Sequence, residues 1–88
     1  MLLVSYDIQD PRRLRQTAKL LRKYGRRIQK SVFLCDISPA RCSELHALLS
    51  KISDDEDSIL CWHLHADTRL DQIGHPILIC NHPDEELF

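Results

Sequence analysis

The order of apolar segments in this sequence predicts a single α+β domain in which helices cover one face of an antiparallel sheet. Two observations on the whole chain support this. Its 88 residues are the size of one small domain. Hydrophobic residues make up 43% of the chain and glycine occurs only twice, which is typical of a folded globular domain. The third observation is the order in which strand-like and helix-like patterns follow one another.

The first strand is predicted at residues 2 to 7, where the apolar run barely alternates and therefore indicates burial on both faces. A helix is expected next. Asp10 is a suitable N-cap, and Pro11 occupies the first helical position, where its missing N–H costs nothing. Gly25 is expected to end the helix. The apolar residues at helical spacing are Leu14, Ala18, Leu21 and Tyr24.

A second extended segment is predicted at residues 27 to 37. Its alternation breaks at Lys30-Ser31, which indicates a bulge or bend there. Ser38-Pro39 then repeats the pattern of a cap followed by proline, and it predicts the start of a second helix. The apolar stripe of that helix comprises Cys42, Leu45, Leu48, Leu49 and Ile52.

A third strand is predicted at residues 58 to 65, after an acidic turn. A short fourth strand is expected around residues 70 to 73. We assign these elements to the ferredoxin-like plan, βαββαβ, in which two helices lie on one face of an antiparallel sheet.

The apolar segment at residues 74 to 80 is surplus to that plan. An unpaired strand invites pairing with a second chain, and a domain this small often needs a partner to be stable. We therefore expect a ferredoxin-like domain over residues 1–75. A C-terminal strand and acidic tail over residues 76–88 would be exchanged at the interface of a homodimer.

Charge is strongly segregated along the chain although the net charge is only −1. Residues 11 to 30 hold nine of the twelve Lys and Arg residues and no acid, whereas acids gather at residues 54–57 and 84–86. Such a basic run is either a solvated face or a surface that binds phosphates, and its single sign favours the second. No base-reading motif is present, so contacts to a nucleic-acid backbone are expected. The candidate residues are Arg12, Arg13, Arg15, Arg22, Arg26 and Arg27.

Several short motifs occur in a fixed order: a Tyr-Asp pair ends the first strand, a basic helix follows, and then come a Tyr-Gly turn and a Ser-Val-Phe strand. In this sequence they are Tyr6-Asp7-Ile8, Tyr24-Gly25, Arg27, Gln29 and Ser31-Val32-Phe33. Over about residues 1 to 75 the chain resembles the CRISPR-associated protein two family, the small subunit of the spacer-integration machinery. It departs from the family at Lys30, where an aromatic is common, and at Leu34-Cys35, where a Glu often follows.

The resemblance implies a ferredoxin-like homodimer that acts in CRISPR adaptation beside a larger integrase subunit. Some family members are metal-dependent nucleases on RNA or double-stranded DNA, and in the integration complex the protein resembles a scaffold. The resemblance further implies that Asp7 binds Mg²⁺ or Mn²⁺ at the dimer axis. It also implies that Tyr6 and Phe33 lie near the active cleft, although residue type alone places Phe33 in the core.

Asp7 has three interpretations from the chemistry of its position. A carboxylate at the end of a buried strand is either a solvated neighbour of the helix cap or a metal ligand. Mg²⁺ usually takes one or two carboxylates. One subunit offers Asp7 and Asp10, but Asp10 is expected to cap the helix, and a two-fold dimer with its two Asp7 residues facing each other would double the number of carboxylates. Alternatively, two facing Asp7 side chains form a like-charge pair with one raised pKa and no metal.

The four cysteines form no C-x-x-C pair and are interpreted as small, half-buried hydrophobes. Cys61, His63 and His65 share one face of the third strand and could begin a zinc site, with a further ligand from His75, Cys80 or His82. The favoured alternative is a half-exposed strand face. On that interpretation the core side of the strand carries Leu60, Trp62 and Leu64.

No segment is long and apolar enough to span a membrane, and no signal peptide is recognisable, so a cytoplasmic location is expected. Two other functions fit the same sequence. One is a toxin-like ribonuclease on the same fold, and the other is a non-enzymatic module that binds a protein partner.

Overall fold

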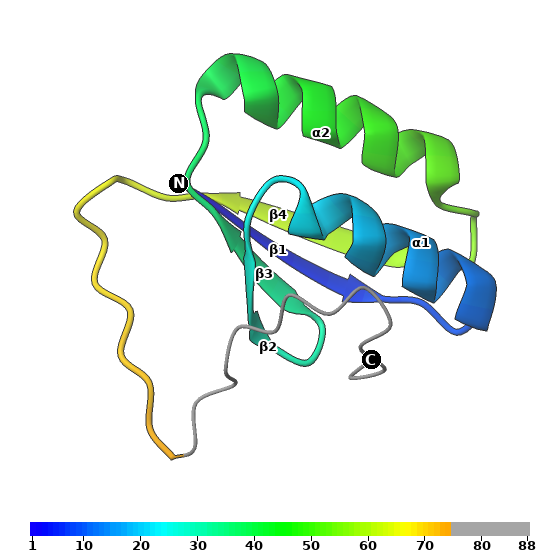
Figure 1. Ribbon diagram of the computed structural model, residues 1–88, viewed down its shortest axis with the longest axis horizontal. Coiled ribbons are helices and arrows are strands. Elements are labelled where there is room, and N and C mark those ends of the chain that lie inside the picture. Colours follow the sequence, from blue (N-terminus) through cyan, green and yellow to red (C-terminus); the bar gives the residue numbers. More distant parts are fainter. Residues whose placement is uncertain (75–88) are drawn as a thin grey trace.

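The computed structural model describes residues 1–74, and these form the predicted βαββαβ order (Figure 1). The sheet is antiparallel with strand order β2-β3-β1-β4, so the ferredoxin-like prediction is confirmed. The proposed C-terminal strand and tail lie, from residue 75 onward, outside the described residues. The elements are β1 Leu2–Asp7, α1 Pro11–Arg22, β2 Arg26–Gln29, β3 Val32–Cys35, α2 Pro39–Ile52 and β4 Ser58–His63.

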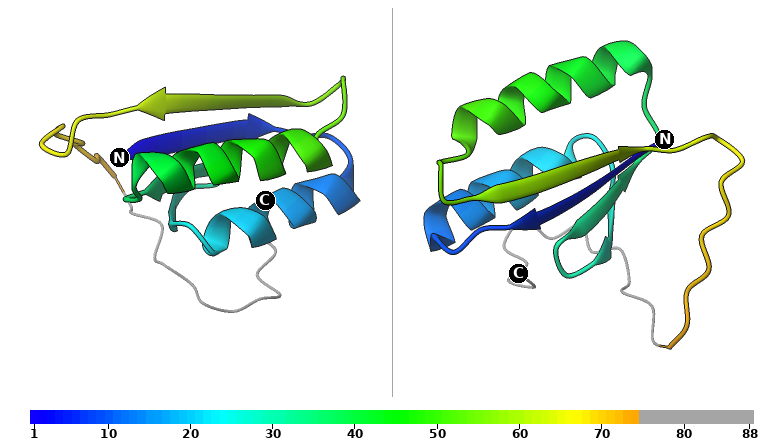
Figure 2. Two further views of the ribbon diagram at one scale, coloured as in Figure 1. Left: turned by 90° about the horizontal axis from the view of Figure 1, so that it is seen from above. Right: turned by 180° about the vertical axis from the view of Figure 1, so that it is seen from behind.

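Both helices lie on the same side of the sheet, and β1 runs through its middle between β3 and β4 (Figures 1 and 2). The core fills the space between the sheet and the helices. In β1 burial alternates, because even-numbered residues face the helices and odd-numbered residues face away. The prediction that this strand is buried on both faces is therefore wrong. The buried core comprises Leu2, Val4, Tyr6, Ile8, Leu21, Phe33, Cys35, Leu45 and Leu49.

The two helix starts follow the predicted chemistry. The Asp10 carboxylate accepts a hydrogen bond from the backbone N–H of Arg13 at 2.9 Å, and Ser38 Oγ accepts one from Arg41 at 3.3 Å. At the other end of α1, a side chain at Gly25 would place its Cβ 2.3 Å from the Leu34 carbonyl oxygen. Glycine is required there because the turn after α1 packs directly on β3.

The break at Lys30-Ser31 is larger than the predicted bulge. It is a turn that divides residues 26–35 into the hairpin β2–β3, and the irregular register lies between Arg27 and Gln29. This hairpin provides the fourth strand of the sheet. Residues 70 to 73 form no strand, so the fourth strand expected there is wrong.

Strand β4 directs toward the core the set of side chains that was predicted to point away from it. Paired residues of neighbouring strands share a face, and the core residue Val4 of β1 lies opposite Cys61. Cys61 therefore packs against the core, while Leu60 is 54% exposed and Trp62 is 45% exposed on the open face. Within the described part of the chain, neither helix has the length and apolar character that crossing a membrane requires.

Candidate functional site

Asp7 ends β1 on the face of the sheet that the helices leave open. Its side chain is exposed and accepts a hydrogen bond of 3.3 Å from Gln9 Nε2. In the register of the sheet it lies opposite Ser58, the first residue of β4. Among residues 1–74 no Lys, Arg or His lies within ion-pair distance of Asp7. The carboxylate is thus available to a cation or to a second copy of the chain.

The open face around Asp7 is apolar. Besides Leu60 and Trp62, it carries half-buried Leu3, and Trp62 and Leu3 line a pocket of about 430 Å³ together with Leu70. A contiguous apolar surface of this kind is unusual on a monomer and commonly marks an interface. Asp7 therefore sits at the border of a surface suited to cover by another protein.

One chain supplies a single carboxylate at this position. Within residues 1–74 no group of three or more His, Cys, Asp or Glu side chains is arranged to hold a metal ion. Asp10 is occupied at the start of α1, as predicted. The oxygen chemistry of Asp7 fits Mg²⁺ or Mn²⁺ only if waters, a phosphate or the Asp7 of a second copy complete the shell.

Tyr6 and Phe33 lie on the other side of the sheet from Asp7. Tyr6 is 3% exposed and Phe33 is fully buried, and their ring centroids are 6.3 Å apart. The prediction that Phe33 belongs to the core is confirmed. Any part of these two rings in a reaction remains a prediction, and their burial favours a positioning role, because Tyr6 fixes the strand end that carries Asp7.

The exposed basic residues form one surface. Arg12, Arg15, Lys19 and Lys23 recur every three or four positions along and just beyond α1, so they lie on the same side of the helix, and all four are exposed. Arg26 is exposed on the edge strand β2, and Arg22 is partly buried. The name basic stripe is used below for Arg12, Arg15, Lys19, Lys23 and Arg26.

Arg13 does not belong to the basic stripe. Its Nε lies 2.8 Å from Asp57 Oδ2, and its Nη2 lies 2.6 Å from Glu56 Oε1. Asp54 and Asp10 are also within 4 Å of its guanidinium. The expectation that the basic run is unrelieved by acids is therefore wrong at Arg13, because the fold brings the acidic turn of residues 54–57 to it. The hydrogen bond from Arg13 lowers the pKa of Asp57, and the acids raise the pKa of Arg13.

Arg27 is also not a surface residue. It is 8% exposed, and its guanidinium carbon lies 5.4 Å from the centre of the Phe33 ring. Arg27 pairs with Phe33 in the β2–β3 register, so both point to the helix side. Its expected place among the phosphate contacts stays a prediction, and the burial of Arg27 on the helix side of the sheet disfavours it.

The cysteine and histidine candidates divide between the core and the surface. Cys35 is fully buried, and burial raises the pKa of its thiol to about 11, with smaller contributions from nearby Cys42 and Cys61. Such thiols stay protonated near neutral pH, as expected for small hydrophobes. His65 is exposed outside β4, and the proposed partners His75, Cys80 and His82 lie outside the described residues.

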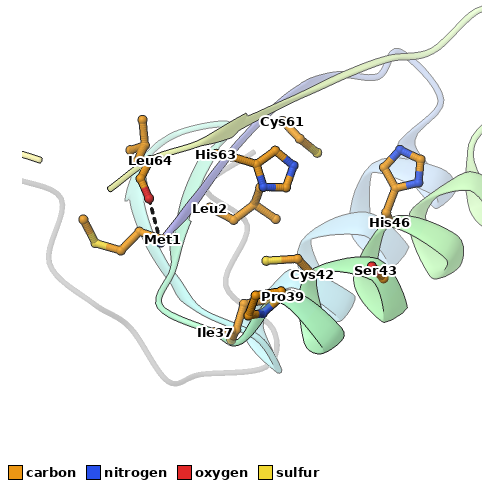
Figure 3. Close-up of a pocket in the computed structure, with 10 residues that line it drawn as sticks. All are labelled: Met1, Leu2, Ile37, Pro39, Cys42, Ser43, His46, Cys61, His63 and Leu64. Atoms are coloured by element: carbon orange, nitrogen blue, oxygen red, sulfur yellow. Dashed lines mark hydrogen bonds between the residues drawn. The ribbon is translucent and has the colours of Figure 1, made fainter. Parts of the chain in front are cut away.

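Figure 3 shows the pocket beside these residues, at the β4 side of α2. It has a volume of about 520 Å³, and His63 and Cys61 of β4 face Cys42 and His46 of α2 across it. The amino group of Met1 donates a hydrogen bond of 3.0 Å to the Leu64 carbonyl at its border. The sequence pattern did not indicate this pocket, since it depends on the packing of α2 against β4.

Two features had no signal in the sequence. The contact of Arg13 with Asp57 spans 44 residues, and the hydrogen bond from Tyr24 Oη to Glu44 joins the end of α1 to α2. The guanidinium carbon of Arg41 lies 4.5 Å from the centre of the Tyr24 ring, so Arg41 packs beside this second contact. The first contact joins α1 to the acidic turn that follows α2, and the second joins the turn after α1 to α2.

These features define a class: a small ferredoxin-like protein with helices on one face of its sheet and an open, partly apolar second face that ends in an aspartate. Comparison with known proteins gives the family. Residues 1–71 match the family model described as CRISPR associated protein Cas2. The chain belongs to this family.

Individual relatives agree with the assignment. Over 79 residues the chain is 42% identical to CRISPR-associated endoribonuclease Cas2 3 of Synechocystis, with 86% of each chain covered. It is 33% identical over 82 residues to CRISPR-associated endonuclease Cas2 of Halalkalibacterium halodurans, which covers 84% of this chain and 85% of that one. The crystal structure of Streptococcus pyogenes Cas2 is similar with a TM-score of 0.74 and 37% identity, over 83% of this chain and 98% of that chain.

Proposed function

We propose that the chain is a homodimeric nucleic-acid-binding protein of CRISPR adaptation with a divalent-metal-dependent nuclease site at Asp7. One observation carries the proposal. Asp7 is an exposed carboxylate without an ion-pair partner among residues 1–74, and it borders an apolar sheet face that the helices leave uncovered.

The open sheet face is the proposed dimer interface. Leu60 and Trp62 are large side chains that lie about half in water, and burial against a second copy would remove apolar area worth about 25 cal/mol per Å². A two-fold interface uses the same patch on both chains, so an axis that passes beside Asp7 would bring the two Asp7 residues to one cleft. The interface would thereby convert one carboxylate per chain into a pair.

The pair of Asp7 carboxylates would hold Mg²⁺ or Mn²⁺, which when bound supplies an activated water and polarises a phosphodiester. In one chain, packed Tyr6 anchors the end of β1, and Gln9 donates to Asp7, so the carboxylate is held in place at the cleft. Without a cation, two facing carboxylates would repel each other.

The basic stripe would bind the phosphate backbone of the nucleic acid. Arg12, Arg15 and Arg26 are exposed, and their planar guanidinium groups suit phosphate oxygens. Two of the six arginines predicted from the sequence contact other parts of the fold: Arg13 pairs with Asp57, and Arg27 is buried beside the Phe33 ring. Relatives named endoribonuclease and endonuclease leave both RNA and double-stranded DNA as substrates to be compared.

A scaffold role beside a larger integrase subunit is proposed for the same dimer, because the basic stripe serves DNA binding with or without cleavage. The discriminating assay incubates the purified chain with labelled single-stranded RNA and duplex DNA, with Mn²⁺ or with a chelator. Metal-dependent cleavage that disappears in Asp7→Asn supports the nuclease. Salt-sensitive binding of duplex DNA without cleavage supports the scaffold alone.

Three results would contradict the proposal. Cleavage by an Asp7→Asn preparation shown free of contaminating nuclease would remove Asp7 from the mechanism. Absence of both cleavage and binding would instead favour the interaction module that the sequence left open. A toxin-like ribonuclease would be indicated if RNA alone is cut and duplex DNA is not bound.

A further inference from the structure

Ser58 lies beside Asp7 on the open face of the sheet. It is the first residue of β4, and the register pairs it directly with Asp7, the last residue of β1 (Figure 1). Both residues are exposed. Side chains directly opposite each other on antiparallel strands share a face, and their Cβ atoms are about 4.5–5.5 Å apart. The Ser58 hydroxyl and the Asp7 carboxylate are therefore close enough to contact one small ion.

The position of Ser58 is fixed by the residue before it. The side chain of Asp57 is fully covered, and its Oδ2 accepts hydrogen bonds of 2.8 Å from Arg13 Nε and from the backbone N–H of Asp54. The backbone N–H of Asp57 donates back to the Asp54 carbonyl at 2.9 Å. These bonds close the turn before β4 and tie it to α1, so they hold the start of the strand in one place.

The end of β1 and the start of β4 are thus constructed in the same way. At the end of β1, buried Tyr6 anchors the strand and Asp7 follows on the open face. At the start of β4, covered Asp57 anchors the strand and Ser58 follows on the open face. The fold therefore presents two polar side chains together, each supported by a neighbour packed on the protein.

The chemistry of Asp7 and Ser58 suits a hard divalent cation. Mg²⁺ prefers oxygen ligands, and it usually keeps several waters beside one or two carboxylates. A serine hydroxyl is a Mg²⁺ ligand in phosphate-binding loops, where it adds an oxygen without adding charge. A second oxygen for a cation at Asp7 is thus available within the same chain.

We propose that the Ser58 hydroxyl is a ligand of the divalent cation that Asp7 binds, and that the ion pair of Arg13 and Asp57 positions it. The inference rests on the proposed metal site at Asp7 and adds one oxygen of the same chain to that site. Waters, a phosphate or a second copy would supply the remaining oxygens. Arg13 then acts as a positioning residue from α1, which differs from the phosphate contact that the sequence predicted.

The first test is a calorimetric titration of the full chain with Mn²⁺ in the absence of nucleic acid, so that affinity is measured without cleavage. Ser58→Ala should weaken Mn²⁺ binding about tenfold, the scale of effect common for groups that support a metal site. Ser58→Thr keeps a hydroxyl and should retain most of the affinity. Ser43→Ala is the matched control, because Ser43 is an exposed serine of α2 that lines the pocket of Figure 3.

A change of metal tests direct ligation. Ser58→Cys replaces the oxygen by sulfur, which binds Mn²⁺ poorly and soft cations such as Cd²⁺ well. This variant should lose Mn²⁺ affinity and gain Cd²⁺ affinity relative to the parent. The gain in Cd²⁺ affinity should disappear when Asp7→Asn is added, because the new thiol and Asp7 would hold the same ion.

Arg13→Gln tests the positioning role, because two effects predict opposite results. Removal of a nearby positive charge alone would strengthen the binding of Mn²⁺. Loss of the support for Asp57 should instead weaken it about tenfold. Lys51→Gln is the control, since it removes an equal charge from the exposed last turn of α2 and should not weaken binding. Circular dichroism checks that each variant is folded at the temperature of the titration.

The possible failures can be told apart. If Asp7→Asn binds Mn²⁺ as the parent does, or if the parent binds none, the proposed metal site is wrong and this inference falls with it. If Asp7→Asn abolishes binding while Ser58→Ala binds like the parent, the metal site stands and Ser58 is not its ligand. Equal weakening by Ser58→Ala and Ser58→Thr would overturn the role of the hydroxyl. Binding by Arg13→Gln that is as tight as in the parent, or tighter, would overturn the positioning role.

Discussion

Tyr6 and Asp7 are consecutive residues of β1, yet their side chains leave opposite faces of the sheet. Tyr6 is 3% exposed under the helices, whereas Asp7 is exposed on the open face. The packing of one residue therefore fixes the position of the other. This relationship separates the molecule into a buried side, covered by the helices, and an open side, with the candidate metal ligand.

Asp7→Asn should abolish any stabilisation of the chain by Mn²⁺ or Mg²⁺. A ligand that binds only the folded dimer stabilises it by RT ln(1 + [metal]/Kd), about 2.7 kcal/mol at a hundredfold excess over Kd. Without metal the variant should be as stable as the parent or more so, because two facing like charges are removed. Melting curves of both proteins with and without Mn²⁺ measure this.

Asp36→Asn is the control for that experiment, because Asp36 is an exposed aspartate at the opposite end of the sheet. It should keep the full metal response. An equal response of parent and Asp7→Asn would show that the cation binds elsewhere.

The local elements could be predicted because their signals are local. Asp10 and Ser38, each followed by proline, start the helices where the sequence indicated. What could not be predicted depends on register. Trp62 and Leu60 are larger and more apolar than Cys61, so the sequence favoured them for the core. Pairing of Cys61 with Val4 decides the face instead.

The candidate site was also predictable only in part, because some of its residues depend on contacts between segments that are far apart in the sequence. The strand-terminal position of Asp7 was evident from the apolar run before it. The removal of Arg13 and Arg27 from the basic surface was not, since both depend on partners that the fold supplies. The partner of Arg13 is Asp57, which is 44 residues away in the sequence. Arg27 is buried over the Phe33 ring, in a β2–β3 hairpin that the sequence pattern had indicated as one strand.

Arg12→Ala combined with Arg15→Ala should weaken binding to all nucleic-acid sequences alike. Each lost phosphate contact should reduce the slope of log K against log[salt] by about 0.9 for duplex DNA. Titrations at several salt concentrations on two unrelated duplexes measure both effects. Arg69→Ala is the control, because Arg69 is exposed but pairs with Asp71 away from α1. Unchanged affinity of the double variant would mean that the basic stripe is only a solvated face.

Asp57→Asn should lower the melting temperature at neutral pH by several degrees, because Asp57 accepts from Arg13 and from the backbone N–H of Asp54 at 2.8 Å. The fold lowers the pKa of Asp57 below its ordinary value of 3.8. Its contribution is therefore present above that value and is lost as pH falls through the lowered pKa. The difference between parent and variant should shrink in that acid range.

Asp55→Asn is the control for this pH series, since Asp55 is an exposed neighbour in the same acidic turn and none of the ion pairs of Arg13 involves it. It should melt like the parent at every pH. A constant difference between Asp57→Asn and the parent down to pH 2 would show that the ionised carboxylate is not the source of the stability.

Trp62→Glu should separate the proposed dimer into folded monomers. In one chain Trp62 is 45% exposed on the open sheet face, so a charge there costs little folding stability but disrupts an apolar interface. Loss of one large aromatic contact of this kind commonly costs 2 kcal/mol or more, which is about a thirtyfold rise in the dimer dissociation constant. Sedimentation at several concentrations gives that constant, and circular dichroism checks the fold.

Ala47→Glu is the control, because it places the same charge on the exposed side of α2 and should leave the proposed dimer intact. If Trp62→Glu sediments like the parent while Ala47→Glu dissociates, the interface is on the helices and Asp7 is not at its axis.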